Sequence, residues 1–319
     1  MLICVPVYNE ELVLTDFIQS LHLAILYYLE HYKHAAITVK FCFNGTDRSQ
    51  EVLEQTIGEL DLPYTVITMD SSPKGKIHAQ RTMLKDYDQF DYVLFADADT
   101  VVDKGSIDAL YRELTTTENL LVYGKMIPAC TSNGLLPWLQ RVHYQWQDHI
   151  LSPRNYFHGR FFMVQSSICS AFYDNRSGLG DLVDGFRVDD IYLSRNLVHI
   201  YGTGRMKEVT DARVWFGMIT SFSDYYRAVK RLYREILRLD ALYPEHAYVQ
   251  PRYFKRKIEK EKLRRLPLAV QGHYLAYRVF DRTMQKVVSL SILAEQKGWK
   301  RASDMWKPTI STKNKFINS

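Results

Sequence analysis

Residues 91–99 read DYVLFADAD, an apolar run that ends in two aspartates one residue apart. A short apolar run with polar residues at its ends is typical of a strand buried on both faces. Side chains two positions apart in an extended chain point the same way, so Asp97 and Asp99 can bind one cation beyond the strand. Mg²⁺ and Mn²⁺ accept carboxylate and phosphate oxygens. The pattern also fits a solvated strand end, so the rest of the chain has to decide its meaning.

Predicted strands and helices alternate around this segment. Further apolar runs predict strands at residues 2–7, 37–43, 64–69 and 120–123. Apolar residues three and four apart predict helices at 14–32, 52–57 and 106–114. This order predicts an α/β fold with a doubly wound, mainly parallel sheet of the Rossmann-like nucleotide-binding kind. Ligands bind at the carboxyl ends of such strands, so we expect Asn9, Asn44 and Asp97 to gather at one rim.

The pattern is less regular beyond residue 125. Residues 137–150 are aromatic and polar, residues 159–164 predict a short strand, and a helix is expected from Asp189 onward. From residue 223 the sequence has a mostly helical pattern with many basic residues. We therefore expect a helical, basic C-terminal extension after the α/β part.

Charge is distributed unevenly along the 319 residues. The net charge is +5, but residues 225–319 hold 22 Lys and Arg against 8 Asp and Glu, a net +14, and the rest of the chain carries −9. The basic segment therefore either faces an acidic partner or packs against the acidic part of the chain. With 46% apolar residues, the chain can bury a substantial core, and its length fits about two domains.

The cysteines and the apolar runs bear on location. Four scattered cysteines without a CxxC spacing indicate a reduced, intracellular protein. Residues 1–11 lack the features of a signal peptide, and the longest apolar stretch, at 21–29, is shorter than the roughly 20 residues that span a bilayer. We expect a cytoplasmic protein.

Five segments together resemble the family-2-type glycosyltransferases of the GT-A fold. That family has motifs close to VPxYNEE, KGKxxAxxN, LDADT, GxxF and EDxxL. This chain has, in the same order, VPVYNEE at 5–11, KGKIHAQR at 74–81, FADADT at 95–100, GRFF at 159–162 and VDDIYL at 188–193. The resemblance covers about residues 1–235 and is far more specific than the aspartate pair alone.

The resemblance implies a metal-dependent, inverting transfer of a sugar from a nucleoside diphosphate sugar to an acceptor hydroxyl. Mn²⁺ or Mg²⁺ would bind Asp97 and Asp99, and Asp190 would be the general base. The donor, for which family frequency favours a UDP-sugar, would contact a set of residues near the first two strands and the aspartate pair: Pro6, Tyr8, Asn9, Glu10, Asn44, Lys76, Arg81, Asp97 and Ala98.

Ordinary structural roles compete with several of these assignments. Acidic residues at a helix start interact with free backbone N–H groups, which is the alternative for Asp190. Lys76 and Arg81 suit phosphate contacts, but long basic side chains in loops are usually just solvated. Tyr8 can equally be a packing residue.

The sequence also departs from the family pattern. Residues 43–47 read FNGTD where the family has an acidic residue before a Gly-Ser turn. The QxxRW motif and the transmembrane helices of processive synthases are missing, which favours a non-processive, soluble or peripheral enzyme. We expect a catalytic domain at 1–222, with a nucleotide-sugar half at 1–125 and an acceptor half at 126–222, followed by a segment at 223–319.

The basic run at 252–265 suggests a contact with a partner. Its Lys and Arg residues alternate with Tyr253, Phe254, Leu263 and Leu266, so a helix here could lie on the anionic inner face of a membrane and reach a lipid-linked acceptor. The alternative for this run is that it packs on the acidic domain. The acceptor could also be a saccharide that is not linked to a lipid.

Other functions fit less well. A nucleotidyltransferase normally has a Gly-rich phosphate loop near its first strand, and residues 1–11 contain no glycine. A nucleic-acid-binding protein would need stacking aromatic residues in a basic groove, for which Tyr253 and Phe254 are thin support. We therefore expect no nucleic acid partner. A catalytically inactive sugar-nucleotide binder would not need Asp97, Asp99 and Asp190 together.

Overall fold

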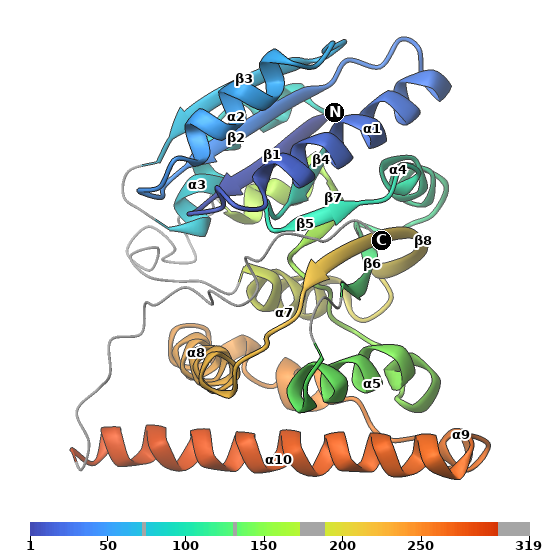
Figure 1. Cartoon of the computed structure of the whole chain (residues 1–319), viewed down its shortest axis with the longest axis vertical. Coiled ribbons are helices and arrows are strands. Elements are labelled where there is room, and N and C mark those ends of the chain that lie inside the picture. Colours follow the sequence, from blue (N-terminus) through green and yellow to red (C-terminus); the bar gives the residue numbers. More distant parts are fainter. Residues whose placement is uncertain (72–74, 130–132, 173–188, 299–319) are drawn as a thin grey trace. The chain divides into compact units, whose positions relative to one another are not determined.

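The computed structural model describes residues 1–71, 75–129, 133–172 and 189–298. Its main feature is an eight-stranded sheet in the order β3-β2-β1-β4-β7-β6-β8-β5 (Figure 1). The strands are β1 (Leu2–Val7), β2 (Thr38–Phe43), β3 (Thr65–Asp70), β4 (Tyr92–Ala96), β5 (Thr100–Val102), β6 (Leu121–Ala129), β7 (Phe161–Gln165) and β8 (Met206–Gly217).

The sheet confirms the predicted fold class. β1 pairs in parallel with both β2 and β4, and β2 pairs in parallel with β3. β7 is antiparallel to β4 and to β6, so β6 runs in the same direction as β4. β5 and β8, which pair antiparallel, were not predicted from the sequence. A three-residue strand such as β5 is too short to show a periodic pattern.

Apolar side chains explain the first half of this fold. Residues Leu2 to Val5 of β1 are fully buried, as a central parallel strand requires. The predicted stripe of the first helix, α1 (Leu14–His31), is buried at Leu14, Phe17, Ile18, Leu21, Ile25 and Tyr28. The helices that accompany the sheet are α1, α2 (Ser49–Gly58), α3 (Lys76–Met83), α4 (Ser106–Thr116) and α7 (Asp189–Tyr201).

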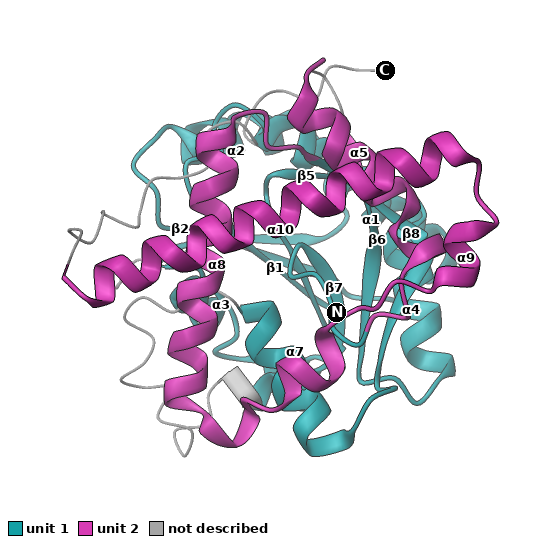
Figure 2. Cartoon of the chain, turned by 90° about the horizontal axis from the view of Figure 1, so that it is seen from below, with its two compact units in different colours: residues 1–127, 155–216 teal, residues 128–154, 217–319 magenta. Residues whose placement is uncertain are grey.

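The chain forms two compact units that are not continuous in sequence (Figure 2). Unit 1 comprises residues 1–127 and 155–216, and unit 2 comprises 128–154 and 217–319. The expected division at residue 222 lies close to one of these boundaries, but the segment 128–154 belongs to unit 2. The division into functional domains stays a prediction.

Unit 2 is helical, in agreement with the predicted C-terminal extension. It contains α5 (Leu135–Ile150), α8 (Phe222–Leu242), the short turns Pro244–His246 and Gln250–Phe254, α9 (Lys260–Arg264) and α10 (Leu268–Gln296). The helix α5 was not predicted. It buries Leu136, Leu139, Val142 and Ile150 at helical spacing, and Pro137 fits because it lies in the first turn.

The basic run 252–265 is not one helix, because Gln250–Phe254 and α9 (Lys260–Arg264) are separate elements. Its apolar residues turn inward: Phe254 is buried, and Leu263 and Leu266 pack against a cluster around Tyr274. Arg256 pairs with Asp148 at 3.1 Å within unit 2. Phe254, Leu263 and Leu266 therefore do not form an exposed apolar face of the run. In the part of the chain that the structure describes, no helix has the length and hydropathy needed to cross a membrane.

Candidate active site

The loops that follow β1 and β2 are joined by hydrogen bonds. Asn9 has a positive φ of 54°, and its Oδ1 accepts the N–H of Thr46 at 2.8 Å. A Cβ on Gly45 would lie 2.5 Å from Asn9 Oδ1 and 2.7 Å from Asn9 N, so this approach needs a glycine. Both loops lie at the carboxyl ends of parallel strands, where the sequence places Asn9 and Asn44.

Asp47 strengthens the same junction. Its carboxylate accepts the N–H of Glu11 at 3.0 Å and the hydroxyl of Ser49 at 2.7 Å. The Ser49 hydroxyl oxygen in turn accepts the N–H of Glu10 at 2.9 Å. These bonds fix the backbone of the first two loops before any ligand binds.

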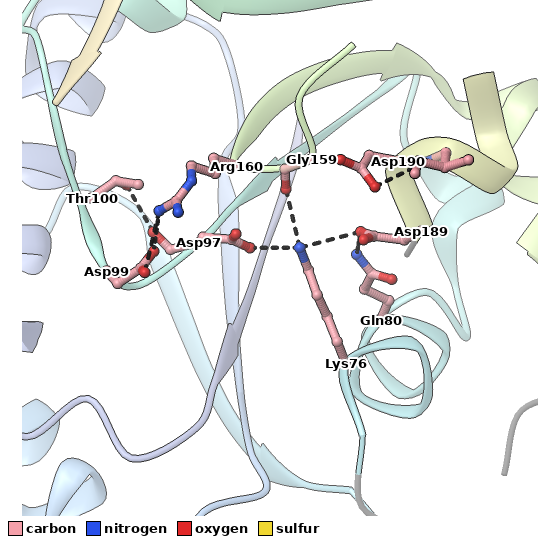
Figure 3. Close-up of polar contacts among 10 residues, drawn as sticks. Lys76, Gln80, Asp97, Asp99, Thr100, Gly159, Arg160, Asp189 and Asp190 are labelled. Carbon is pink, nitrogen blue, oxygen red and sulfur yellow. Dashed lines mark hydrogen bonds and ion pairs between the residues drawn. The ribbon is translucent and has the colours of Figure 1, made fainter. Parts of the chain in front are cut away.

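Asp97 is at the centre of a second cluster, at the end of β4 (Figure 3). Its backbone N–H donates to the carbonyl of Arg160 at 2.7 Å. The Lys76 Nζ lies 2.8 Å from Asp97 Oδ1 and 3.3 Å from Asp189 Oδ2. The same ammonium donates to the carbonyl of Gly159 at 3.1 Å. One lysine therefore connects α3, β4, the loop before β7 and α7.

Asp99 has a cation of its own. Arg160 Nη1 lies 3.1 Å from Oδ1 and 3.2 Å from Oδ2 of Asp99. The Arg160 guanidinium also stacks over the Phe216 ring, 4.8 Å from the ring centroid. Figure 3 shows the two carboxylates of the aspartate pair facing different cations, Lys76 and Arg160.

Two aspartates begin α7 on the other side of Lys76. Asp189 is 4% exposed and accepts a hydrogen bond from Gln80 Nε2 at 2.7 Å. Asp190 accepts the N–H of Ile191 at 2.8 Å. A Cβ on Gly159 would lie 3.0 Å from Asp190 Cβ, so the absence of a side chain at Gly159 allows this close approach.

The carboxylates outnumber the cations here, and this changes their pKa values. Burial raises the pKa of Asp190 to about 6, the charge of Asp189 adds to this shift, and Lys76 opposes it. Burial likewise raises the pKa of Asp97, against the effect of Lys76. Burial disfavours the charged Lys76, but Asp189 and Asp97 outweigh it and raise its pKa. With a pKa of about 6, the Asp190 carboxyl is ionised at neutral pH.

The predicted site residues fall into groups. Lys76, Asp97, Asp99 and Asp190 gather around the end of β4, with Ala98 buried between the two aspartates of the pair. Another group belongs to the first two strands and their loops: Pro6, Tyr8, Asn9, Glu10 and Asn44. Arg81 lies further along α3, on the turn after Lys76.

Three members of the cluster were not assigned a role from the sequence: Gln80, Arg160 and Asp189. Gln80 had a usable signal, because it lies four residues after Lys76, and residues with that spacing share one face of a helix. Both side chains reach Asp189. Arg160 and Asp189 stand inside the quoted motifs, but only the fold shows which carboxylate or cation each one meets.

The donor atoms fit a hard divalent cation only in part. Asp97 and Asp99 offer carboxylate oxygens, the ligands that Mn²⁺ and Mg²⁺ prefer. Among the residues that the structure describes, no group of three or more His, Cys, Asp or Glu side chains could hold a metal. An ion at the aspartate pair would therefore take its remaining ligands from a substrate, as diphosphate oxygens allow. It would also have to displace Arg160 from Asp99.

The sequence matches the model of one enzyme family. The sequence model of Glycosyl transferase family 2 matches residues 2–176. Solved structures similar to this chain include Staphylococcus aureus TarS 1–349, at 16% identity and a TM-score of 0.47, over 93% of this chain and 77% of that chain. TarS 1–349 in complex with UDP-GlcNAc is 13% identical, with a TM-score of 0.43, over 86% and 78%. The mannosyltransferase PcManGT from Pyrobaculum calidifontis, in complex with GDP-Man and Mn²⁺, is 13% identical, with a TM-score of 0.49, over 97% and 81%. No curated protein matches the sequence.

Proposed function

This chain belongs to glycosyl transferase family 2, and we propose that it moves a sugar from a nucleoside diphosphate sugar to an acceptor hydroxyl with inversion at the anomeric carbon. The observation that carries this proposal is the cluster at the end of β4. There, Lys76 Nζ lies 2.8 Å from Asp97, and a Cβ on Gly159 would lie 3.0 Å from the Asp190 Cβ, so Asp190 lies close against Gly159. Carboxylates and a lysine ammonium thus meet where an α/β sheet binds its ligands.

Asp190 is the proposed general base. It takes the proton of the acceptor hydroxyl while that oxygen attacks the anomeric carbon, and the bond from this carbon to the diphosphate oxygen breaks in the same displacement. A raised pKa suits this role, because the carboxylate is ionised at neutral pH yet basic enough to accept a proton. Asp189 supports it as a positioning residue, since its carboxylate holds Lys76 and Gln80.

The leaving diphosphate needs positive charge. Lys76 and Arg160 lie beside the aspartate pair and supply it from the chain itself. A divalent ion, Mn²⁺ or Mg²⁺, held by Asp97 and Asp99 would add charge next to the departing oxygen. Arg81 is a further proposed phosphate contact from α3.

The first two loops are the proposed nucleoside site. Asn9 and the loop 44–47 are fixed in place by the Thr46 and Asp47 hydrogen bonds. Loops whose backbone is held by hydrogen bonds in this way suit the recognition of a planar base and ribose. The contacts would come from Pro6, Tyr8, Asn9, Glu10, Asn44 and Ala98. A uridine nucleotide is proposed on the frequency of such donors in the family.

The acceptor is a saccharide or a lipid-linked molecule in this proposal, and the pathway is the synthesis of a glycan or glycolipid. The three free cysteines described by the structure, Cys4, Cys42 and Cys169, are all buried, which is compatible with the proposed cytoplasmic location. There the enzyme would work at the inner face of the membrane.

Sugar transfer by the Asp190→Asn variant tests the proposal. Wild-type protein is incubated with Mn²⁺, a panel of sugar nucleotides and saccharide or lipid-linked acceptors, and the released nucleoside diphosphate is measured. Loss of a general base lowers kcat by about 10²–10⁴-fold. The charge-matched control is Asp88→Asn, at an exposed position, which should keep wild-type turnover. Unchanged turnover in Asp190→Asn would exclude Asp190 as the base.

A further inference from the structure

The long helix α10 is packed on one side only. α5 and α8 both contact it, and Figure 1 shows both on the same side of it. Tyr274, Tyr277, Val288 and Ile292 are buried on that side. The opposite side, which we name the outer face of α10, exposes six large apolar residues: Leu268, Leu275, Val279, Val287, Leu290 and Leu293.

These apolar residues are strongly exposed and run along the whole helix. Leu268 is 83% exposed, and Val279 and Leu290 are each 66% exposed. Single exposed apolar residues are common on protein surfaces, but a continuous stripe usually marks a binding surface. The helix has 29 residues, so the stripe is about 40 Å long.

The outer face carries positive charge only. Arg282 and Lys286 are exposed on it, in the middle of the apolar stripe. The two carboxylates of α10 turn inward instead. Asp281 accepts a hydrogen bond from Gln285, and Glu295 pairs with Lys230 and Arg234 of α8. Apolar residues that insert into a membrane interface can be accompanied by Arg and Lys, whose long stems lie along the apolar surface while their charged ends reach the lipid phosphates, so this face suits an anionic membrane interface.

Exposed basic residues also precede the helix. Lys255, Lys257, Lys260, Lys262, Arg264 and Arg265 are basic, and all are exposed. Exposed or half-buried carboxylates in this stretch are Glu259 and Glu261, so the surface beside the start of α10 has an excess of positive charge. Clusters of four to eight Lys and Arg residues next to such a helix favour anionic lipids.

We infer that the outer face of α10 binds the surface of an anionic lipid bilayer, with the helix axis parallel to the membrane plane. The apolar stripe enters the boundary between headgroups and acyl chains, and Arg282 and Lys286 pair with lipid phosphates. Only the consequence of this binding rests on the proposed function: the bound enzyme would be held near a lipid-linked acceptor. Lipid binding itself requires no sugar transfer.

Charge argues against two other occupants of this face. Two copies of the chain joined through α10 would bring Arg282 and Lys286 of both copies together with no carboxylate on the face to pair with them. The sequence of residues 299–319, which lies outside the described part, holds five Lys or Arg and one Asp. This segment has the same positive sign of charge as the outer face of α10, so charge also argues against it as the occupant of that face.

Vesicle sedimentation of the full chain tests the inference. The probes are vesicles of phosphatidylcholine alone and of phosphatidylcholine with phosphatidylglycerol. Wild-type protein should bind the anionic vesicles and lose binding as salt is raised. Val279→Glu combined with Leu290→Glu should lower that binding at least tenfold. Arg282→Gln combined with Lys286→Gln should lower it about fivefold for each charge removed.

Controls separate this inference from folding effects and from the proposed function. Leu23→Glu combined with Ile200→Glu adds the same charge at exposed apolar positions of α1 and α7, and should bind like wild type. The Val279→Glu/Leu290→Glu variant should keep wild-type nucleotide binding and remain folded. Absence of binding to anionic vesicles, or equal binding by this variant, overturns the inference. So does a wild-type dimer that this variant converts to a monomer.

Discussion

Asp189 and Asp190 are neighbours with different surroundings. Asp189 is nearly fully buried and its carboxylate is occupied by Lys76 and Gln80, which suits a residue that holds others in place. Asp190 has a raised pKa and a backbone donor at one oxygen. This difference is why we propose the second aspartate as the base, although both are the first residues of α7.

The pH profile of the wild-type enzyme tests this assignment. The pKa of Asp190 is raised to about 6, so the carboxyl is protonated and inactive as a base below that pH. We predict that kcat/KM falls as pH drops through about 6, by about tenfold for each further pH unit, since this ratio reports groups of the free enzyme. The residual activity of Asp190→Asn should not show this fall in kcat/KM at acid pH. If kcat/KM falls only near pH 4, the usual pKa of a carboxyl group, the assignment of Asp190 as the base is contradicted.

Lys76 makes a second prediction at the residue scale. Its ammonium lies between Asp97 and Asp189 and is 26% exposed, so Lys76→Met removes this cation from the partly buried Asp97 and the nearly fully buried Asp189. We expect a loss of about 1–3 kcal/mol in the free energy of unfolding, measured by urea denaturation at pH 7. Lys76→Arg keeps the charge and should lose less.

The control for this effect is Lys33→Met, which removes an exposed lysine after α1 and should change stability by less than about 0.5 kcal/mol. Equal stability of Lys76→Met and Lys33→Met would show that the ion pairs of Lys76 contribute nothing to the fold.

Sequence alone could place these residues at the site but not define their partners. Asp97, Asp99 and Asp190 follow from local motifs, because each lies at the end of a strand or the start of a helix. Lys76 was expected to meet phosphate; the structure shows it between carboxylates of β4 and α7. That geometry is a tertiary contact between distant segments, and no local pattern encodes it.

At the scale of elements, the loops after β1 and β2 act together. Asn9, with its positive φ, places its side chain on the backbone of Thr46, and Gly45 leaves room for this contact. The proposed nucleoside site therefore depends on a junction of two loops rather than on either loop alone.

Gly45→Ala tests this junction. The added Cβ would lie 2.5 Å from Asn9 Oδ1 and 2.7 Å from Asn9 N, so the loops have to move apart. We predict a loss of about 1–3 kcal/mol in the free energy of unfolding and weaker nucleotide binding. Gly58→Ala is the matched control, because nothing lies within 4 Å of a Cβ there. It should be neutral or stabilise by up to about 1 kcal/mol. If both variants behave alike, the junction is not closely packed.

The elements also show which sequence patterns were informative. The buried strands β1, β2 and β4 and the helix α1 were predicted from continuous or periodic apolar runs. The helix α5 was not, because its buried face includes Gln140 and Gln147, and Trp, His and Tyr residues between the buried positions obscure the periodicity. β8 alternates only in its second half, where Ala212, Val214 and Phe216 are buried.

At the scale of the whole molecule, the two units differ in charge and in the roles proposed for them. Unit 1 contains every residue of the proposed catalytic site, and unit 2 contains α10 with its outer face. The excess positive charge of the C-terminal segment is partly neutralised inside unit 2, where Lys230, Arg234 and Arg256 have carboxylate partners. The exposed remainder is the positive charge that we propose to bind anionic lipids.

Calorimetric titration with a panel of nucleoside diphosphates and their sugars, with and without Mn²⁺, tests the central claim most directly. We predict that wild-type protein binds one nucleotide, a uridine diphosphate in our proposal, only when Mn²⁺ is present. Asp99→Ala should lose this metal-dependent binding, and the control Asp88→Ala should keep it. No binding by wild-type protein under either condition, or binding that neither Mn²⁺ nor Asp99→Ala changes, would contradict a metal-assisted donor site at Asp97 and Asp99.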